Sequence, residues 1–329
     1  MWKFILKRLL LGVFIVVAGS LVVYAVIRCL PTSYVESIAR QRASNPTSTK
    51  TYQEWLDQLN AIYRLDRGIL AGFFGWLGDA LKGDFGESWN YGIPVVQKFK
   101  EVIWCSVAMN LITLVIEVAA ALPLGILAAR KQYSKTDYAV TVFALLGISL
   151  PSFFLATVLK YVFAARLQWF DIAGLVGRYY DQLDTWGKIL DMGKHLVLPV
   201  VTLGMLSIGG LMRYTRTNML EVLNSDYIRT ARAKGLPERK VINKHAFRNT
   251  LIPLVTYMSY LLPSMFGGSM ITETLFQIPG IGYISYQAIT SGDIPFAMFY
   301  NLFLLILTQV SLIVADIMYA VVDPRVRIA

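Results

Sequence analysis

The sequence predicts an all-α polytopic membrane protein, and three observations support that prediction. Hydrophobic residues make up 56% of the 329 residues and charged residues only 16%, whereas a soluble domain contains about 25% charged residues. Long apolar stretches recur along the chain at a length that suits a bilayer. Basic residues gather in some of the connecting segments and not in others. The formal net charge of +10 therefore indicates membrane topology, and we expect no nucleic-acid partner.

Six stretches are apolar and long enough, or nearly long enough, to cross a membrane, because about 20 residues in a helix span the hydrocarbon core. They are residues 9–27, 102–129, 138–165, 196–212, 251–275 and 296–321. The fourth stretch is short, and its ends are poorly defined. The first is longer than the apolar core of a secretory signal, and no small-residue cleavage site follows it. We therefore expect six transmembrane helices, including an uncleaved first helix.

Six spans place both ends of the chain on one side of the membrane, and the charges identify that side. Its segments carry 17 basic and five acidic residues, whereas the opposite segments carry 13 of each. Positive loops stay in the cytoplasm, so we expect cytoplasmic termini and a cytoplasmic loop over residues 213–250. Residues 1–101 would form a first transmembrane helix with an external cap. Residues 102–329 would supply five further helices and that loop.

The external part of residues 1–101 is expected to be a small helical cap on the outer leaflet. Apolar residues recur at helical spacing over residues 52–63, with polar residues on the other face. Residues 69–81 form a shorter apolar run rich in aromatic side chains, which favour the membrane interface. The preceding residues 43–49 are polar and loop-like. The cap is either a spacer between spans or a docking surface for an external partner.

The most basic segment of the chain is residues 226–248. A compact positive loop on one face of a membrane protein indicates contact with a soluble partner. Small residues within it, Thr230, Ala231 and Ala233, would allow such a partner to approach closely. We expect a second helical stretch over residues 238–249 to lead into the fifth span.

The first part of this loop has the start and stop signals of a two-turn helix over residues 227–234. Ser225 or Asp226 would cap it, because either side chain can accept hydrogen bonds from unpaired backbone N–H groups. Gly235 suits the left-handed residue at the end of a helix, and Pro237 prevents continuation.

Several motifs in this order resemble the permease subunits of bacterial ABC importers, and more closely the first permease of the oligopeptide, dipeptide and nickel branch. The motifs are Tyr227-Ile228-Arg229-Thr230-Ala231-Arg232-Ala233-Lys234-Gly235-Leu236, His245-Ala246-Phe247-Arg248-Asn249, Glu273-Thr274-Leu275-Phe276, Pro279-Gly280-Ile281-Gly282, Asp293-Ile294-Pro295 and Asp323-Pro324-Arg325-Val326-Arg327. The general importer signature begins Glu-Ala-Ala, where this chain has Arg229, Thr230 and Ala231. The peptide branch shares that departure.

The resemblance implies a type I ABC importer transmembrane-domain fold in a multi-pass protein of the bacterial cell membrane. It also implies a cytoplasmic coupling helix that sits in a cleft of an ATPase subunit. The residues matched to that helix are Tyr227, Arg229, Thr230, Ala231, Arg232, Lys234, Gly235 and Leu236. Expected partners are a second, homologous permease in a heterodimer, two ABC ATPase subunits, an extracytoplasmic substrate-binding protein and the lipid bilayer. Peptides are the favoured cargo, with nickel or another small solute as alternatives.

The sequence contains none of the motifs that would make the chain an ATPase. It has no Gly-x-x-x-x-Gly-Lys-Ser/Thr loop to hold nucleotide phosphates, so partner subunits would hydrolyse ATP. Its two histidines, His195 and His245, fall on opposite sides of the predicted membrane, and its cysteines, Cys29 and Cys105, form no CxxC pair. We therefore expect a transport subunit without enzyme activity, cofactor or metal.

Polar residues within the spans are candidates for the translocation path. Asn110, Thr113 and Glu117 share one face of the second stretch by their spacing, and Asn301 and Thr308 share one face of the sixth. Interhelical hydrogen bonding is the alternative role for Glu117, since a charge in the membrane must face protein or water. Three other charged residues lie nearer span ends, where snorkelling is easier. They are Lys160, Glu273 and Asp316.

External residues are candidates for a gate or a docking surface. They are Trp76, Asp84, Phe85, Pro279, Gly280 and Gly282. Residues 166–195 and 276–295 complete the predicted external part, and the latter has a turn at Pro279 followed by a short helix over residues 281–289.

An ATP-independent carrier or an intramembrane enzyme is the alternative class. A proton-coupled carrier needs ionisable relays across the spans, and Glu117 is nearly alone at mid-membrane. A hydrolase needs a nucleophile with a base at similar depth, and the sequence shows neither.

Overall fold

The computed structural model describes residues 2–29, 34–44, 50–62, 65–259 and 261–322. The described residues are mostly helical and hold no β-strand beyond an isolated bridge between Glu87 and Pro94. The Asp323–Arg327 motif and most of the polar stretch 43–49 lie outside them. The chain divides into two compact units, each of two segments. The first comprises Met1–Trp104 and Ile284–Val310, and the second comprises Cys105–Tyr283 and Ser311–Ala329.

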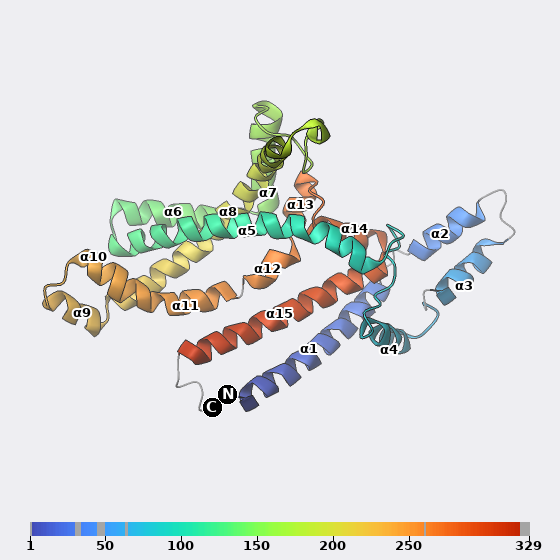
Figure 1. The fold of residues 1–329 in the computed structure, drawn as a ribbon, viewed down its shortest axis with the longest axis horizontal. Helices are drawn as coiled ribbons and strands as arrows, with labels where there is room; N and C mark the ends of the chain where they lie inside the picture. The colour runs from blue at the N-terminus through green and yellow to red at the C-terminus, as the bar shows by residue number, and fades with distance from the viewer. Residues whose placement is uncertain (1, 30–33, 45–49, 63–64, 260, 323–329) are drawn as a thin grey trace. The chain divides into compact units, whose positions relative to one another are not determined.

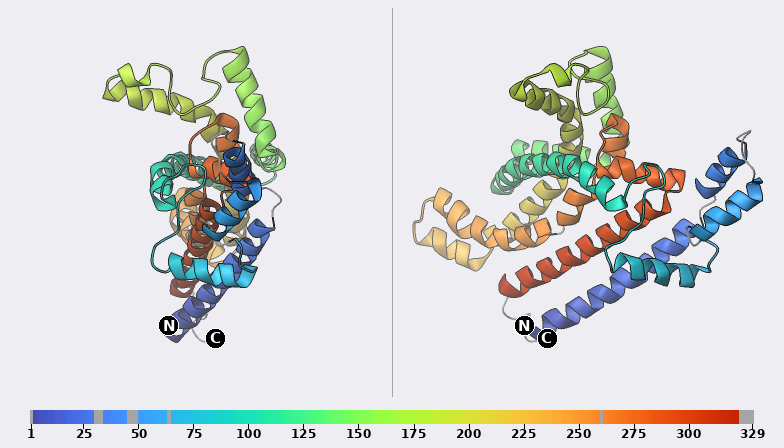
Figure 2. Two further views of the ribbon diagram at one scale, coloured as in Figure 1. Left: turned by 90° about the vertical axis from the view of Figure 1, so that its right-hand side faces the viewer. Right: turned by 45° about the vertical axis from the view of Figure 1, so that its right-hand side comes forward.

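The described part of the first unit is built on α1 and the first part of α15, with shorter helical pieces beside them. Its elements are α1 (Trp2–Arg28), α2 (Tyr34–Ala43), α3 (Tyr52–Ile62), α4 (Ile69–Ala80), the start of α5 (Val95–Arg130), most of α14 (Ile281–Ser291) and the first part of α15 (Ile294–Val322). α4 lies against α1 (Figure 2). Tyr24, Phe73 and Met298 form a buried cluster there. α2 packs on α3 around Val35 and Leu59. The two helices predicted for the external segment are thereby confirmed as α3 and α4.

The second unit is formed by helices that pack around the long helix α8. Its elements are most of α5 (Val95–Arg130), α6 (Lys135–Ser149), α7 (Ser152–Leu159), η1 (Lys160–Arg166), η2 (Tyr180–Gln182), α8 (Thr185–Leu223), α9 (Asp226–Ala233), α10 (Glu238–Lys240), η3 (Val241–Ala246), α11 (Phe247–Ser259), α12 (Leu262–Gly267), α13 (Met270–Phe276) and the start of α14 (Ile281–Ser291). Figure 1 shows α6, α7 and α11 arranged along α8, and each of them contacts it.

Among the described residues, four helices are long and apolar enough to cross a membrane. They are Leu6–Arg28, Val95–Arg130, Thr185–Leu223 and Ile294–Ile317. The third predicted stretch is bent by 101° between Ser149 and Ser152, and it adds a fifth span if both halves count as one. Pro151 stands at the bend, where it cannot donate the hydrogen bond that would continue the helix.

Two predicted stretches have different limits in the structure. The expectation of one continuous helix over residues 251–275 is wrong, because the chain there forms three helices, α11, α12 and α13. Gly268, with φ of +74°, separates the last two. The fourth stretch is much longer than predicted, because α8 begins at Thr185. The Asp184 side chain caps its first turn by accepting a hydrogen bond from the Gly187 N–H group.

Glycines allow α6 and α8 to approach each other closely. A Cβ atom at Gly209 of α8 would lie 2.6 Å from the Ala144 carbonyl oxygen, and one at Gly147 of α6 would overlap the Met205 carbonyl oxygen. Small residues at helix contacts are typical of membrane bundles. The same two helices are joined by an ion pair in which two nitrogens of the Arg216 guanidinium group donate to the Asp137 carboxylate, at 2.7 and 2.8 Å.

Replacing Gly209 by alanine should therefore destabilise the second unit. The added methyl group must displace a backbone carbonyl, and overpacking of this kind costs about 1–3 kcal/mol. Gly204→Ala is the matched control, because nothing lies within 4 Å of a Cβ atom at that position of the same helix. Thermal denaturation in detergent should show a lower midpoint for Gly209→Ala only. Equal midpoints for the two variants would contradict the close packing described above.

Candidate functional site

The helix α9 has one buried face and one exposed face. Ile228 and Ala231 are buried, and they pack on a cluster that includes Met219, Val241 and Ala246. Residues along the other side of the helix are exposed. They are Tyr227, Arg229, Thr230, Arg232, Ala233, Lys234 and Gly235. Most residues predicted to contact a partner are therefore available on one surface, whereas Ala231 is turned inward.

The ends of α9 only partly follow the prediction. Gly235 has the expected left-handed backbone, with φ of +75°. The predicted side-chain cap at the start is wrong, because Ser225 occupies the cap position but its side chain makes no hydrogen bond to the helix. Its hydroxyl group donates instead to the Val222 carbonyl oxygen at 2.6 Å, at the end of α8. That carbonyl oxygen lies only three residues earlier in the chain, so this local bond competes with the predicted cap.

An ion pair fastens α9 to the following segment. Two donors of the Arg232 guanidinium contact the Glu238 carboxylate, at 2.8 and 3.2 Å. Hydrogen bonding with Arg232 lowers the pKa of the Glu238 carboxyl group below its usual value of 4.5. Both side chains are about half exposed, and exposed pairs contribute only about 0.2–1 kcal/mol. We therefore expect the pair to add a little stability to residues 226–240 without determining their fold.

This pair should make the order of the loop pH-dependent. Because the pKa of Glu238 is lowered by folding, the stabilisation is fully present above pH 4.5 and is lost as the pH falls through the lowered value. Arg232→Gln should speed hydrogen exchange of residues 226–240 at neutral pH and have no effect in strong acid. Arg239→Gln, an exposed neighbour, is the control. An effect of Arg232→Gln that persists in strong acid would exclude the carboxylate as its cause.

A buried carboxylate organises the chain between α12 and α14. Glu273 is fully buried and accepts hydrogen bonds from the Ser106 hydroxyl group at 2.7 Å, the Ser269 N–H at 2.9 Å and the Tyr283 N–H at 3.0 Å. The Ser106 oxygen in turn accepts from the Ile281 N–H at 2.8 Å. These bonds satisfy backbone N–H groups at the starts of α13 and α14. Without them, buried N–H groups would remain unpaired.

The predicted gate glycines lie around this carboxylate. A Cβ atom at Gly280 would overlap both the Glu273 carboxylate and the Ser106 hydroxyl group, and one at Gly282 would lie 2.7 Å from the Met270 nitrogen. Pro279, beside them, is exposed. The two glycines of the motif Pro279–Gly282 therefore pack against Glu273. The sequence hints at this close packing only through the small size of the glycines.

Two of the three charges expected to snorkel at span ends are placed differently. Glu273 points into the protein and has no exposed surface. Lys160 donates a hydrogen bond to the Leu275 carbonyl oxygen at 2.6 Å and is half-buried. Both bonds satisfy backbone groups at helix ends, which explains why the side chains turn inward. Asp316 is also half-buried.

Glu273→Gln should destabilise the junction. Glutamine keeps the shape but replaces one acceptor oxygen by an N–H₂ group, which would face a backbone donor. Losing a hydrogen bond to a buried charged group costs about 1.5–3 kcal/mol. Glu221→Gln, at an exposed site on α8, should change stability by less than about 0.5 kcal/mol. Thermal unfolding in detergent compares the two, and a neutral Glu273→Gln would show that the carboxylate charge is dispensable.

The structure brings together three of the predicted pathway residues. Asn110, Thr113 and Glu117 line a cavity of about 170 Å³ in the second unit. Ser269 donates to the Asn110 side-chain oxygen at 2.9 Å across this cavity. The other two candidates, in α15, bond to their own helix. Asn301 donates to the Ala297 carbonyl oxygen and Thr308 to that of Leu304.

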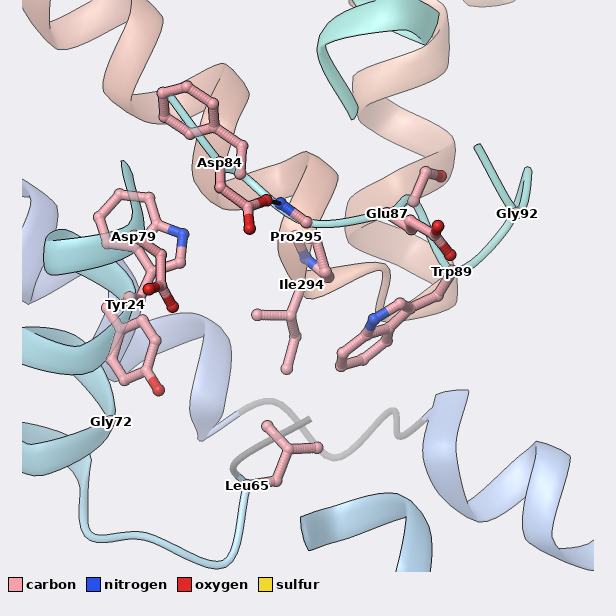
Figure 3. A pocket seen from close by; sticks show the side chains of 14 residues that line it. Tyr24, Leu65, Gly72, Asp79, Asp84, Glu87, Trp89, Gly92, Ile294 and Pro295 are labelled. Carbon is pink, nitrogen blue, oxygen red and sulfur yellow. Dashed lines mark hydrogen bonds between the residues drawn. The ribbon is translucent and has the colours of Figure 1, made fainter. Parts of the chain in front are cut away.

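The first unit contains a larger cavity, of about 430 Å³. The predicted external residues Trp76, Asp84 and Phe85 line it, and Figure 3 shows Asp84 on its wall. Sequence reasoning did not identify Glu87 and Trp89, which Figure 3 shows on the wall of the same cavity. They lie in the turn that follows α4, where no helical spacing of apolar residues marks them as neighbours of the predicted external residues.

The sequence profile of the binding-protein-dependent transport system inner membrane components matches residues 121–328. The chain belongs to this family. It is 32% identical to the oligopeptide transport system permease protein AppB of Bacillus subtilis (strain 168) over 328 residues, which cover 99% of this chain and 100% of that one. It is 32% identical to the di/tripeptide transport system permease protein DppB of Pseudomonas aeruginosa (strain UCBPP-PA14), with 99% of each chain covered. The resemblance stated from the motifs is thereby confirmed.

A solved structure shares the fold. The MetNI methionine ABC transporter in inward-facing conformations superposes with a TM-score of 0.53, covering 69% of this chain and 97% of that one, at 18% identity. With the apolar helices described above, the family places this chain among multi-pass membrane proteins.

Proposed function

We propose that the chain is the permease subunit of an ATP-driven importer that moves oligo- or dipeptides into a bacterial cell. The observation that supports it best is α9, a short basic helix with an exposed outer face and a buried inner face. Such a helix suits a cleft in a soluble partner. The cargo follows from relatives that are named as peptide permeases. Nickel or another small solute remains the alternative cargo of the same transporter class.

The proposed topology has six spans and cytoplasmic termini in the cell membrane. The broken run α11–α13 would serve as the fifth span, since non-helical backbone is tolerated inside a membrane where protein buries it. The excess of basic residues supports a cytoplasmic position for residues 213–250, and hence for α9. Residues 1–101 would form the first span and cap, and residues 102–329 the rest of the transmembrane domain.

ATP hydrolysis would take place in two partner ATPase subunits, and this chain would receive the motion through α9. The buried face of α9 packs against residues of α8 and η3, and Arg232 ties it to Glu238. A displacement of α9 would therefore move α8 and α11 with it. A second, homologous permease would complete the translocation path, and an external binding protein would deliver the peptide. Each ligand shifts the inward–outward equilibrium by its difference in affinity for the two states.

The remaining site residues have proposed roles along this path. Asn110, Thr113 and Glu117 would line it in the second unit, where they share a cavity. Asn301 and Thr308 would line it from α15. The external candidates would serve as a gate or as a docking surface for the binding protein. They are Trp76, Asp84, Phe85, Pro279, Gly280 and Gly282.

Gly235→Val tests the proposed coupling role. Valine at φ of +75° is strained by about 1–3 kcal/mol, so the end of α9 should distort. In proteoliposomes that contain the complete transporter, peptide-stimulated ATPase activity and uptake should both fall. Gly193→Val is the matched control, because that glycine is open and has no positive φ.

Arg229→Glu tests the exposed face of α9 without straining the backbone. Arg229 is largely exposed, so the variant should fold normally and co-purify with less ATPase subunit. Normal coupling in both Gly235→Val and Arg229→Glu would contradict the assignment of α9. Peptide uptake that persists after removal of the ATPase subunits would contradict the importer class as a whole.

A further inference from the structure

Glu117 is a buried carboxylate in the apolar helix α5. Its side chain is only 5% exposed, so it faces neither lipid nor open water. It lies on the wall of the 170 Å³ cavity that α5, α8 and α12 enclose. A charge at such a site requires a partner, because removing an ion from water is costly unless another group compensates it.

The neighbours of Glu117 do not supply a compensating charge. Among the described residues that line the cavity, Glu117 alone is ionisable. Its hydrogen-bond partner is the Ser207 hydroxyl group, which also lies near the Gly204 carbonyl oxygen. The ion pairs found among the described residues do not include Glu117.

The other polar side chains of the cavity form hydrogen bonds within the protein. Asn110 receives the Ser269 hydroxyl hydrogen and donates to the Met265 carbonyl oxygen. Thr113 donates to the Met109 carbonyl oxygen within α5. These bonds leave Glu117 as the one acidic side chain among the described residues of a cavity that is otherwise lined by neutral groups. Burial alone disfavours the ionised form of such a side chain, so a cation that enters the cavity would be the group that compensates its charge.

We propose that Glu117 binds the protonated amino terminus of the peptide during its passage through the permease. This inference rests on the proposed function and identifies the part of the cargo that the path recognises. The cavity is smaller than the roughly 300–1,000 Å³ of sites that enclose a whole small molecule. It therefore fits one end of a peptide and leaves the rest in the path beyond it.

An organic ammonium group suits the cavity better than a metal ion. A metal site of the Ca²⁺ or Mg²⁺ type needs several oxygen ligands around the ion. No group of three or more His, Cys, Asp or Glu side chains able to hold a metal occurs among the described residues. An ammonium group requires only one carboxylate and neutral acceptors, such as the Asn110 oxygen and the serine hydroxyl groups.

Ligand binding to the complete transporter in nanodiscs, without binding protein, tests this inference. The probes are tri-alanine with a free amino terminus and N-acetyl-tri-alanine, and saturation-transfer NMR reports weak binding of each. Wild type should bind the free peptide at least about tenfold more tightly than the acetylated one, since the ion pair is lost on acetylation. Glu117→Gln should abolish that preference. Glu117→Asp, which keeps the charge, should preserve it with weaker binding.

The matched control is Glu101→Gln, at an exposed position of the same helix, and it should bind both peptides as wild type does. Equal binding of the two peptides by wild type, or an unchanged preference in Glu117→Gln, would overturn the inference. Gly235→Val separates this inference from the proposed function. That variant should lose coupled uptake while it keeps the preference for a free amino terminus.

Discussion

The second unit depends on one constraint: wherever a helix breaks inside an apolar environment, the freed backbone groups must find partners within the protein. The buried carboxylate of Glu273 meets this requirement at the junction of α12, α13 and α14. It accepts two backbone N–H groups and the Ser106 hydroxyl group, which itself accepts a third backbone N–H. Lys160 performs the complementary task by donating to the Leu275 carbonyl oxygen. The fold can therefore include a broken run where one straight helix was expected.

The helix α9 is held in place by the packing of its buried face. A basic helix of eight residues would not be stable alone in water, and its exposed face contributes little to stability. Ile228 and Ala231 bury the other face against α8 and η3. Arg216 and Asp137 join α8 to α6, and the glycine contacts bring those two helices close together. A force on α9 would therefore reach the long helices through packed contacts.

Glu117 illustrates a different use of buried charge. Glu273 is surrounded by donors and is satisfied within the protein, whereas Glu117 faces a cavity and neutral neighbours. The first arrangement favours a fixed structure, and the second leaves capacity for a ligand. Both residues are glutamates within predicted spans, and only their surroundings in the structure distinguish these two roles.

The sequence by itself determined the helical membrane class, the two helices α3 and α4, the left-handed Gly235 and the family, because composition, periodicity and motif order are local signals. It also placed Asn110, Thr113 and Glu117 on one face. The bend at Pro151 and the bond from the Ser225 hydroxyl group to the Val222 carbonyl oxygen are local features that the residue pattern left open. Only the tertiary structure decided the breaks around Gly268 and the inward direction of Ala231 and Glu273, because each depends on which N–H group or side chain another helix brings close.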